Sequence, residues 1–295
     1  MEKTDIRALR IAYLKKIKKY RSENRPIVFL DESYIHSGHT NSRSWSDDSS
    51  NGLFAEISKG QRLIMIHAGG EMGFIPNALL LFKSGTKSGD YHDEMNGKNY
   101  EKWLIEKLIP NLPEKSVIVT DNAPYHNVQL NPAPTSNSKK AEMIDWLTQK
   151  NMSFSSTMLK PELYSIIKQN KDQHKTYKFD FLLQQHGHTV LRLPPYHPDL
   201  NPIELIWATI KNAVAKLNVT FKLDDVSRLA QIEFAKITPV EWKKRCDHVI
   251  KIEDNYLENE HFVDIQTEEL IINLGEDSDS ESDFSDSDQS LFSDA

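Results

Sequence analysis

Two short apolar runs in the chain are each followed at once by an aspartate. The first is Ile-Val-Phe-Leu before Asp31, and the second is Val-Ile-Val-Thr before Asp121. Short runs rich in β-branched residues and bounded by turn residues are typical of buried strands. In open α/β sheets, ligands bind where the strands reach their carboxyl ends. The pattern therefore predicts two strands whose terminal aspartates face a common site.

The remaining apolar positions alternate between the period of strands and the period of helices. Short runs predict further strands at residues 62–68, 75–82 and 189–193. Apolar residues that recur every three or four positions predict helices at residues 93–109, 202–217 and 223–237. A last helix is expected after Thr238, because Thr238 can cap it and Pro239 suits its first position. This order of elements predicts an α/β fold.

Changes in composition divide the chain into three parts. Residues 1–24 form a basic linker helix, and residues 25–256 form the main domain, in which residues 127–186 are a largely helical insertion. Residues 257–295 are an acidic tail. From about residue 275 the tail holds eight acids, seven serines and no base, so it has too little apolar content to offset the entropy of ordering. We expect this last stretch to be disordered.

The predicted first helix is both amphipathic and basic. Its apolar residues share one face, and lysines and arginines surround them between residues 5 and 21. These charges could simply form a solvated face, or they could serve nuclear import or contact with DNA. The pattern alone leaves these alternatives open.

Overall charge hides a division between the body and the tail. The chain has a net charge of -7, but residues 1–250 carry 35 bases against 28 acids. A basic body is compatible with a polyanionic partner. The single Cys246 excludes an internal disulfide and a cysteine-based zinc cluster. Because there is no membrane-length apolar run or signal-peptide pattern, we expect a soluble, intracellular protein.

A third acid, Glu204, completes a set of carboxylates that could hold two divalent metals. Magnesium and manganese prefer hard oxygen ligands, and two such ions can drive phosphodiester cleavage. Each acid also has a simpler interpretation. Either aspartate could start a turn after its strand, and the segment from Asn201 to Glu204 is a sound capping box. The combination of all three acids, in the order strand, strand, helix, favours the metal site.

Three neighbours of these acids have alternative roles. Asn122 and His126 could orient a ligand or a phosphate, or they could stabilise the turn after Asp121 with hydrogen bonds. Glu32 should point to the opposite side of an extended chain from Asp31, and we do not expect it to be a primary ligand.

The acids and their flanking residues resemble the catalytic domains of mariner-superfamily DDE transposases. The resemblance covers about residues 21–217. Its motifs are Phe-Leu-Asp31-Glu-Ser, Val-Thr-Asp121-Asn-Ala-Pro-Tyr-His126 and Leu-Pro-Pro-Tyr-His-Pro-Asp199-Leu-Asn-Pro-Ile-Glu204-Leu-Ile-Trp207, of which the last is highly specific.

The resemblance implies a ribonuclease H-like fold, with a mixed five-stranded sheet flanked by helices and a helical insertion before the last strand. It implies that Asp31, Asp121 and Glu204 are the catalytic acids and bind two Mg²⁺ or Mn²⁺ ions. Water would attack the DNA at a transposon end, and the freed 3′ hydroxyl would then attack target DNA. The resemblance also implies a homodimer assembled on DNA, and a nuclear location is expected for this chemistry.

Two features depart from the family pattern. Glu204 lies 83 positions after Asp121, so the insertion must loop out without displacing the last strand and helix. Family members also carry paired helix-turn-helix modules before the catalytic domain, whereas this chain begins with one basic helix. We therefore expect an amino-truncated copy, a fragment or a host-adapted descendant. The alternative function is a transposase-derived factor that binds DNA or protein without catalysis, with a possible protein partner for its acidic tail.

Overall fold

The computed structural model describes residues 3–40, 60–85 and 95–276. Residues 1–252 form one compact unit, and residues 253–295 form a second. The acidic tail from residue 277 onward lies outside the described residues. In the described part of the chain, no helix has the length and apolar character needed to cross a membrane.

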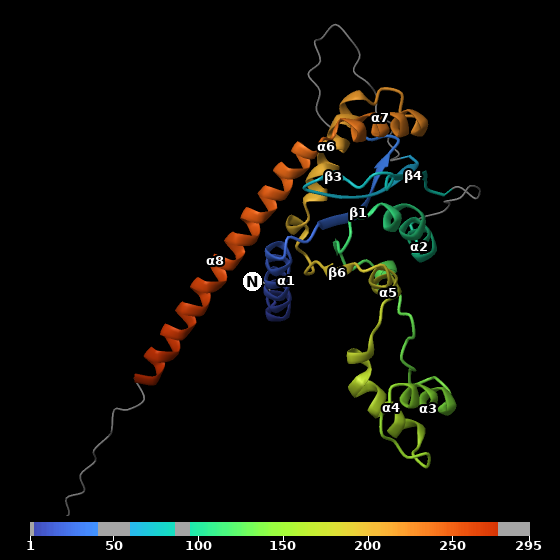
Figure 1. The fold of residues 1–295 in the computed structure, drawn as a ribbon, viewed down its shortest axis with the longest axis vertical. Helices are drawn as coiled ribbons and strands as arrows, with labels where there is room; N and C mark the ends of the chain where they lie inside the picture. The colour runs from blue at the N-terminus through green and yellow to red at the C-terminus, as the bar shows by residue number, and fades with distance from the viewer. Residues whose placement is uncertain (1–2, 41–59, 86–94, 277–295) are drawn as a thin grey trace, which may run out of the picture. The chain divides into compact units, whose positions relative to one another are not determined.

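The core of the first unit is a mixed six-stranded sheet (Figure 1). Its order is β3-β2-β1-β5-β6, and β4 also pairs with β2. β1 is antiparallel to β2 and parallel to β5, which in turn is parallel to β6. The strands are β1 (Ile27–His36), β2 (Arg62–Gly70), β3 (Gly73–Phe74), β4 (Leu80–Lys83), β5 (Val117–Thr120) and β6 (Thr189–Arg192).

This sheet, flanked by helices, confirms the ribonuclease H-like fold class, with six strands in place of the expected five. Of the strand predicted at residues 75–82, only residues 80–82 are a strand, as part of β4, while β3 lies just before the predicted range. Pro76 has no backbone N–H to give to a strand ladder, and Asn77 has a positive φ of 58°. Both residues therefore favour a turn in the middle of the apolar run.

The first strand continues beyond Asp31, so the expectation that it ends there was wrong. Residues 31–36 stay paired with β2, from Asp31 opposite His67 to His36 opposite Arg62. The pairing of β1 with β5, in contrast, stops at Phe29 opposite Val119. Asp31 is therefore still paired with β2, but it lies beyond the last residue of β1 that pairs with β5.

Most helices lie where periodicity placed them. The helices outside the insertion are α1 (Thr4–Ser22), α2 (Gly97–Trp103), α6 (Pro202–Leu217), α7 (Leu223–Lys236) and α8 (Pro239–Glu276). The Thr238 hydroxyl accepts a hydrogen bond from the backbone N–H of Glu241 at 3.3 Å, which confirms the predicted cap of α8. The predicted helix at 93–109 is α2 followed by tighter and wider helical turns that extend to Asn111.

The segment 127–186 contains three helices, namely α3 (Lys140–Gln149), α4 (Lys160–Asn170) and α5 (Lys178–Gln185). α3 and α4 lie side by side and enclose a hydrophobic cluster of their own (Figure 1). α5, within the segment predicted to be largely helical, places Phe179 and Leu183 in the main core against the sheet. Only the α3–α4 hairpin therefore has a separate core.

Gly70 at the end of β2 offers a test of the packing beneath the site. A Cβ added there would overlap the carbonyl oxygen of Ile27, a backbone atom of β1. We expect Gly70→Ala to lower the free energy of unfolding by about 2–3 kcal/mol in urea denaturation. Gly97→Ala is the matched control, because its Cβ would meet only Val128 Cγ2 at 3.5 Å. Equal destabilisation by the two substitutions would contradict this packing.

Candidate active site

Three acids from three separate elements line one pocket. Asp31 lies on β1, Asp121 directly follows β5, and Glu204 is the third residue of α6. The pocket has a volume of about 320 Å³, and its remaining lining comes from the turn after Asp121 and the loop between β6 and α6. The structure thus brings all three predicted acids to one place.

The parallel register explains why the two aspartates meet. Phe29 pairs with Val119, so two residues further along each strand Asp31 stands level with Asp121. Side chains on a strand alternate between faces with a period of two, so these carboxylates share one face of the sheet. Glu204 joins them because Asn201 caps α6: its side-chain oxygen accepts a hydrogen bond from the N–H of Ile203 at 3.4 Å.

Trp207 holds the Asp31 carboxylate. The indole Nε1–H donates a hydrogen bond to Asp31 Oδ2 at 2.8 Å, and the Trp207 ring is buried. Burial raises the pKa of Asp31 well above its ordinary value, and the negative charges of Glu32 and Glu204 raise it further. The neutral indole opposes this shift without overcoming it. This environment therefore disfavours the charged form of Asp31.

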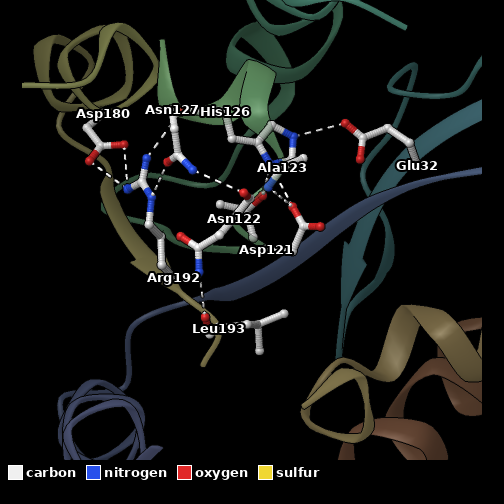
Figure 2. Close-up of polar contacts among 10 residues, drawn as sticks. Glu32, Asp121, Asn122, Ala123, His126, Asn127, Asp180, Arg192 and Leu193 are labelled. Carbon is white, nitrogen blue, oxygen red and sulfur yellow. Dashed lines mark hydrogen bonds and ion pairs between the residues drawn. The ribbon is translucent and has the colours of Figure 1, made fainter. Parts of the chain in front are cut away.

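Asp121 is held by a buried histidine instead (Figure 2). His126 Nδ1 lies 2.7 Å from Asp121 Oδ1, and its Nε2 lies 2.9 Å from Glu32 Oε1. Burial alone would lower the pKa of His126, but its hydrogen bonds to the two carboxylates raise that pKa to about 9. The pKa of Asp121 is lowered despite desolvation, because His126 and the N–H of Ala123 hydrogen-bond to the carboxylate. Asp121 is therefore stabilised in its ionised form.

These contacts decide between the alternatives for the neighbouring residues. Glu32 points away from Asp31 toward His126, as the alternation along β1 predicts. His126 uses both ring nitrogens on carboxylates of the protein, and Asn122 donates to the carbonyl of Leu193 at 3.0 Å. In this structure both residues hold the turn after β5, in agreement with the structural interpretation.

Arg192 supports the same turn, and sequence analysis did not identify it (Figure 2). Its guanidinium donates to both oxygens of Asp180 at 2.9 and 2.7 Å, to Asn127 Oδ1 at 3.1 Å and to the carbonyl of His126 at 3.2 Å. It also lies over the Tyr177 ring. The only signal in the sequence was an arginine at the end of a predicted strand, which indicates no partner.

Two further residues at the site were missed. Lys211 lies on α6 about two turns after Glu204; burial lowers its pKa, while the charges of Glu204 and Asp31 oppose that shift. Tyr196 lines the pocket with 87% of its surface exposed and a positive φ of 64°. An exposed aromatic residue in the left-handed region is uncommon and is a feature of functional loops. The spacing of Lys211 from Glu204 could have identified the first. Tyr196 belongs to the Leu-Pro-Pro-Tyr-His-Pro motif, but the motif does not indicate its exposure or its backbone conformation.

The donors suit a hard divalent cation, although they are not arranged as a finished metal cluster. No three His, Cys, Asp or Glu side chains in the described part of the chain are grouped so as to hold one metal ion. Asp31 and Asp121 are each engaged with a protein partner, and like charges repel. A cation that neutralised the carboxylates would remove the repulsion that raises the pKa of Asp31. The carboxylate oxygens therefore fit magnesium or manganese chemically.

Comparison with known proteins agrees with this geometry. A family profile described as "DDE superfamily endonuclease" matches residues 26–227. A pre-cleavage Mos1 transpososome is similar in structure, with a TM-score of 0.52, 16% identity and coverage of 88% of this chain and 62% of that chain. A Mos1 paired-end complex with the left transposon end has a TM-score of 0.51, 17% identity and coverage of 87% and 61%.

A Mos1 mariner paired-end complex with Mn has a TM-score of 0.50, 17% identity and coverage of 87% and 62%. At these identities the similarity establishes the fold. The chain spans about three fifths of the length of the solved chains that it matches. No match was found among curated proteins.

The charged state of His126 should make stability depend on pH. Its pKa of about 9 in the folded protein exceeds the usual value of about 6.5, so its contribution is complete below pH 6.5 and is lost as the pH rises through 9. We expect His126→Gln to lower the free energy of unfolding by about 3 kcal/mol at pH 6, and by less at pH 10. Urea denaturation without divalent cations measures both values.

The exposed His186 provides the control for this experiment. His186→Gln should have a small effect at both pH values. A loss for His126→Gln that stayed constant from pH 6 to pH 10 would show that the ion pairs with Asp121 and Glu32 do not contribute as described.

Proposed function

Because the chain belongs to the DDE superfamily endonuclease family, we propose that it cleaves phosphodiester bonds in DNA at the pocket of Asp31, Asp121 and Glu204. The observation that carries this proposal is the convergence of three carboxylates from β1, β5 and α6 on one pocket. A site rich in oxygen donors, open to solvent and placed beside the ends of parallel strands suits a metal-dependent reaction on a phosphate ester.

Asp31, Asp121 and Glu204 would hold two Mg²⁺ or Mn²⁺ ions. When bound, such ions activate the attacking oxygen and stabilise the leaving oxygen of an in-line displacement. A related fold has been solved with Mn, which supports the choice of cation. The carboxylates come from three different elements, so they can surround a substrate phosphate from more than one side.

The remaining side chains would position these ligands. His126 and the N–H of Ala123 hold one oxygen of Asp121. Trp207 holds one oxygen of Asp31, and in each case the second carboxylate oxygen is left for a cation. Lys211 adds a positive charge near Glu204 and Asp31, where it would also attract the phosphate backbone.

We further propose that cleavage is one step of DNA transposition. In the full reaction, water would free a 3′ hydroxyl at a transposon end, and this hydroxyl would attack target DNA. The similar structures, a pre-cleavage transpososome and two paired-end complexes, support this assignment and favour a homodimer assembled on DNA. A nuclear location is part of the same proposal, and fluorescence microscopy of a tagged chain would test it.

The central test is cation-dependent nicking of plasmid DNA by the purified protein. We expect nicking with Mn²⁺ or Mg²⁺, and a loss of about 1000-fold or more in Asp121→Asn and in Glu204→Gln, because residues that act as one unit are all required. Asp199→Asn is the matched control. Asp199 lies five residues before Glu204, in the segment between β6 and α6, but it does not line the pocket, so its variant should retain activity.

Activity that survived both substitutions would reject this site. A parent protein that binds DNA but never nicks it would favour the second candidate, a transposase-derived binding factor; the nine bases in residues 1–25 are the observation that supports this candidate.

Cation binding should also be visible without catalysis. In a thermal unfolding experiment, Mn²⁺ at about 100 times its dissociation constant should stabilise the parent by about 2.7 kcal/mol. Asp31→Asn should abolish this rise. Without cation the same variant should be no less stable than the parent, because it removes a buried charge that neighbouring acids repel. An unchanged cation effect in Asp31→Asn would exclude Asp31 as a ligand.

A further inference from the structure

A second groove lies beside the acidic pocket, between α1 and the edge of the sheet at β6. We call it the α1 groove. Its volume is about 380 Å³, and its walls are Leu9, Ala12, Tyr13, Lys16 and Tyr20 from α1 together with Asn122 and residues 190–195. The α1 residues recur every three or four positions, so they form one stripe along the helix. The groove is thus a surface built from a helix face and a strand edge.

The α1 groove adjoins the acidic pocket. Asn122, Leu193, Pro194 and Pro195 line both cavities. Asn122 directly follows Asp121, and its amide is fixed to the carbonyl of Leu193 at 3.0 Å. A polymer bound at the carboxylates would therefore have only this shared wall to cross before it reached the groove.

One wall of the groove belongs to the most basic part of residues 1–250. Residues 1–25 hold nine bases and three acids, whereas residues 26–250 hold 26 bases and 25 acids. The positive excess of the body therefore lies almost entirely in the segment that contains α1. Lys16 is exposed on the groove wall, whereas Tyr13 on the same stripe is buried and packs α1 against the rest of the protein. Positive charge in a groove attracts the backbone of a single nucleic acid strand.

The groove is held in place by contacts of its own. α1 buries Leu14 and Ile17, and Arg25 ties the end of the helix to the sheet. The Arg25 guanidinium donates to Lys115 O at 2.9 Å and to Thr189 Oγ1 on β6 at 2.8 Å. The position of Lys16 relative to the pocket is therefore set by packed structure.

We propose that the α1 groove carries the DNA strand as it leaves the acidic pocket, with Lys16 contacting a backbone phosphate. This inference rests on the proposed function and adds a path for the substrate. The occupant is a nucleic acid strand, because the groove lies between the proposed phosphate-cleaving pocket and the segment that holds most of the positive excess of residues 1–250.

Substitution of two adjacent lysines tests the path. Lys15 and Lys16 are both exposed on α1, but only Lys16 lines the groove. Binding of a fluorescein-labelled DNA with a single-stranded 3′ end is measured by anisotropy in EDTA over a series of salt concentrations. Lys16→Ala should reduce the slope of log affinity against log salt by about one and weaken binding about threefold near 0.1 M salt. Lys15→Ala should change both values much less.

Cross-linking gives a second readout that does not depend on affinity. The single natural Cys246 is buried, so Lys16→Cys and Lys15→Cys each add one accessible thiol. DNA that carries, near its 3′ end, a tethered mixed disulfide with a small thiol should exchange with Lys16→Cys at least about tenfold faster than with Lys15→Cys, because tethering raises the local concentration of the disulfide; the cysteine thiolate attacks it and the small thiol leaves. The parent protein, whose single cysteine is Cys246, measures the background cross-linking at that residue.

If the Lys15 and Lys16 variants behaved alike in both assays, the proposed DNA path along the α1 groove would be rejected. The same result is expected if the groove binds a peptide strand instead of DNA. Failure of catalysis is distinguishable, because both assays are performed without divalent cation. If the parent protein nicks DNA normally and the Lys15 and Lys16 variants do not differ, only the DNA path along the α1 groove is rejected. A selective effect of Lys16 in a protein that never nicks DNA would leave the groove standing and reject the cleavage activity.

Discussion

The site depends on the parallel register between β1 and β5. This pairing aligns Phe29 with Val119, and it thereby sets Asp31 level with Asp121 on one face of the sheet. Adjacent strands lie about 4.8 Å apart, so the two carboxylates must approach each other wherever this register holds. A slip of one residue would send one carboxylate to the opposite face. Backbone pairing, formed by apolar residues that take no part in chemistry, thus determines which acids can act together.

Bringing acids together is unfavourable, and the protein offsets this cost unequally. Asp121 receives a charged partner in His126, which is itself shared with Glu32, and its pKa falls. Asp31 receives only the neutral indole of Trp207, and its pKa stays well above the ordinary value. The Asp121 carboxylate is therefore stabilised in its ionised form, while the ionised form of Asp31 would be stabilised most by a nearby cation. Such opposed environments are a recurrent property of sites that combine acids.

The long separation between Asp121 and Glu204 is absorbed by a segment with its own core. α3 and α4 close around Met143, Leu147 and neighbouring apolar residues, so this hairpin does not need the sheet to bury its hydrophobic surface. The chain then returns through α5, which packs into the main core just before β6. Because β6 pairs with β5 in parallel, α6 begins beside the strand ends and delivers Glu204. An insertion of this kind changes spacing along the sequence without changing the site.

Sequence by itself determined the strands before the two aspartates, the helix that carries Glu204 and the identity of the three acids, because these features depend on local periodicity and on motifs of adjacent residues. It did not determine that β1 runs past Asp31, that Arg192 and Trp207 hold the site, or that Lys16 stands beside the pocket. Those facts depend on pairs of residues far apart in the chain, such as Trp207 and Asp31, which are 176 positions apart. Only the folded sheet brings such residues together, since a periodic pattern specifies which face of an element is buried but not the partner that buries it.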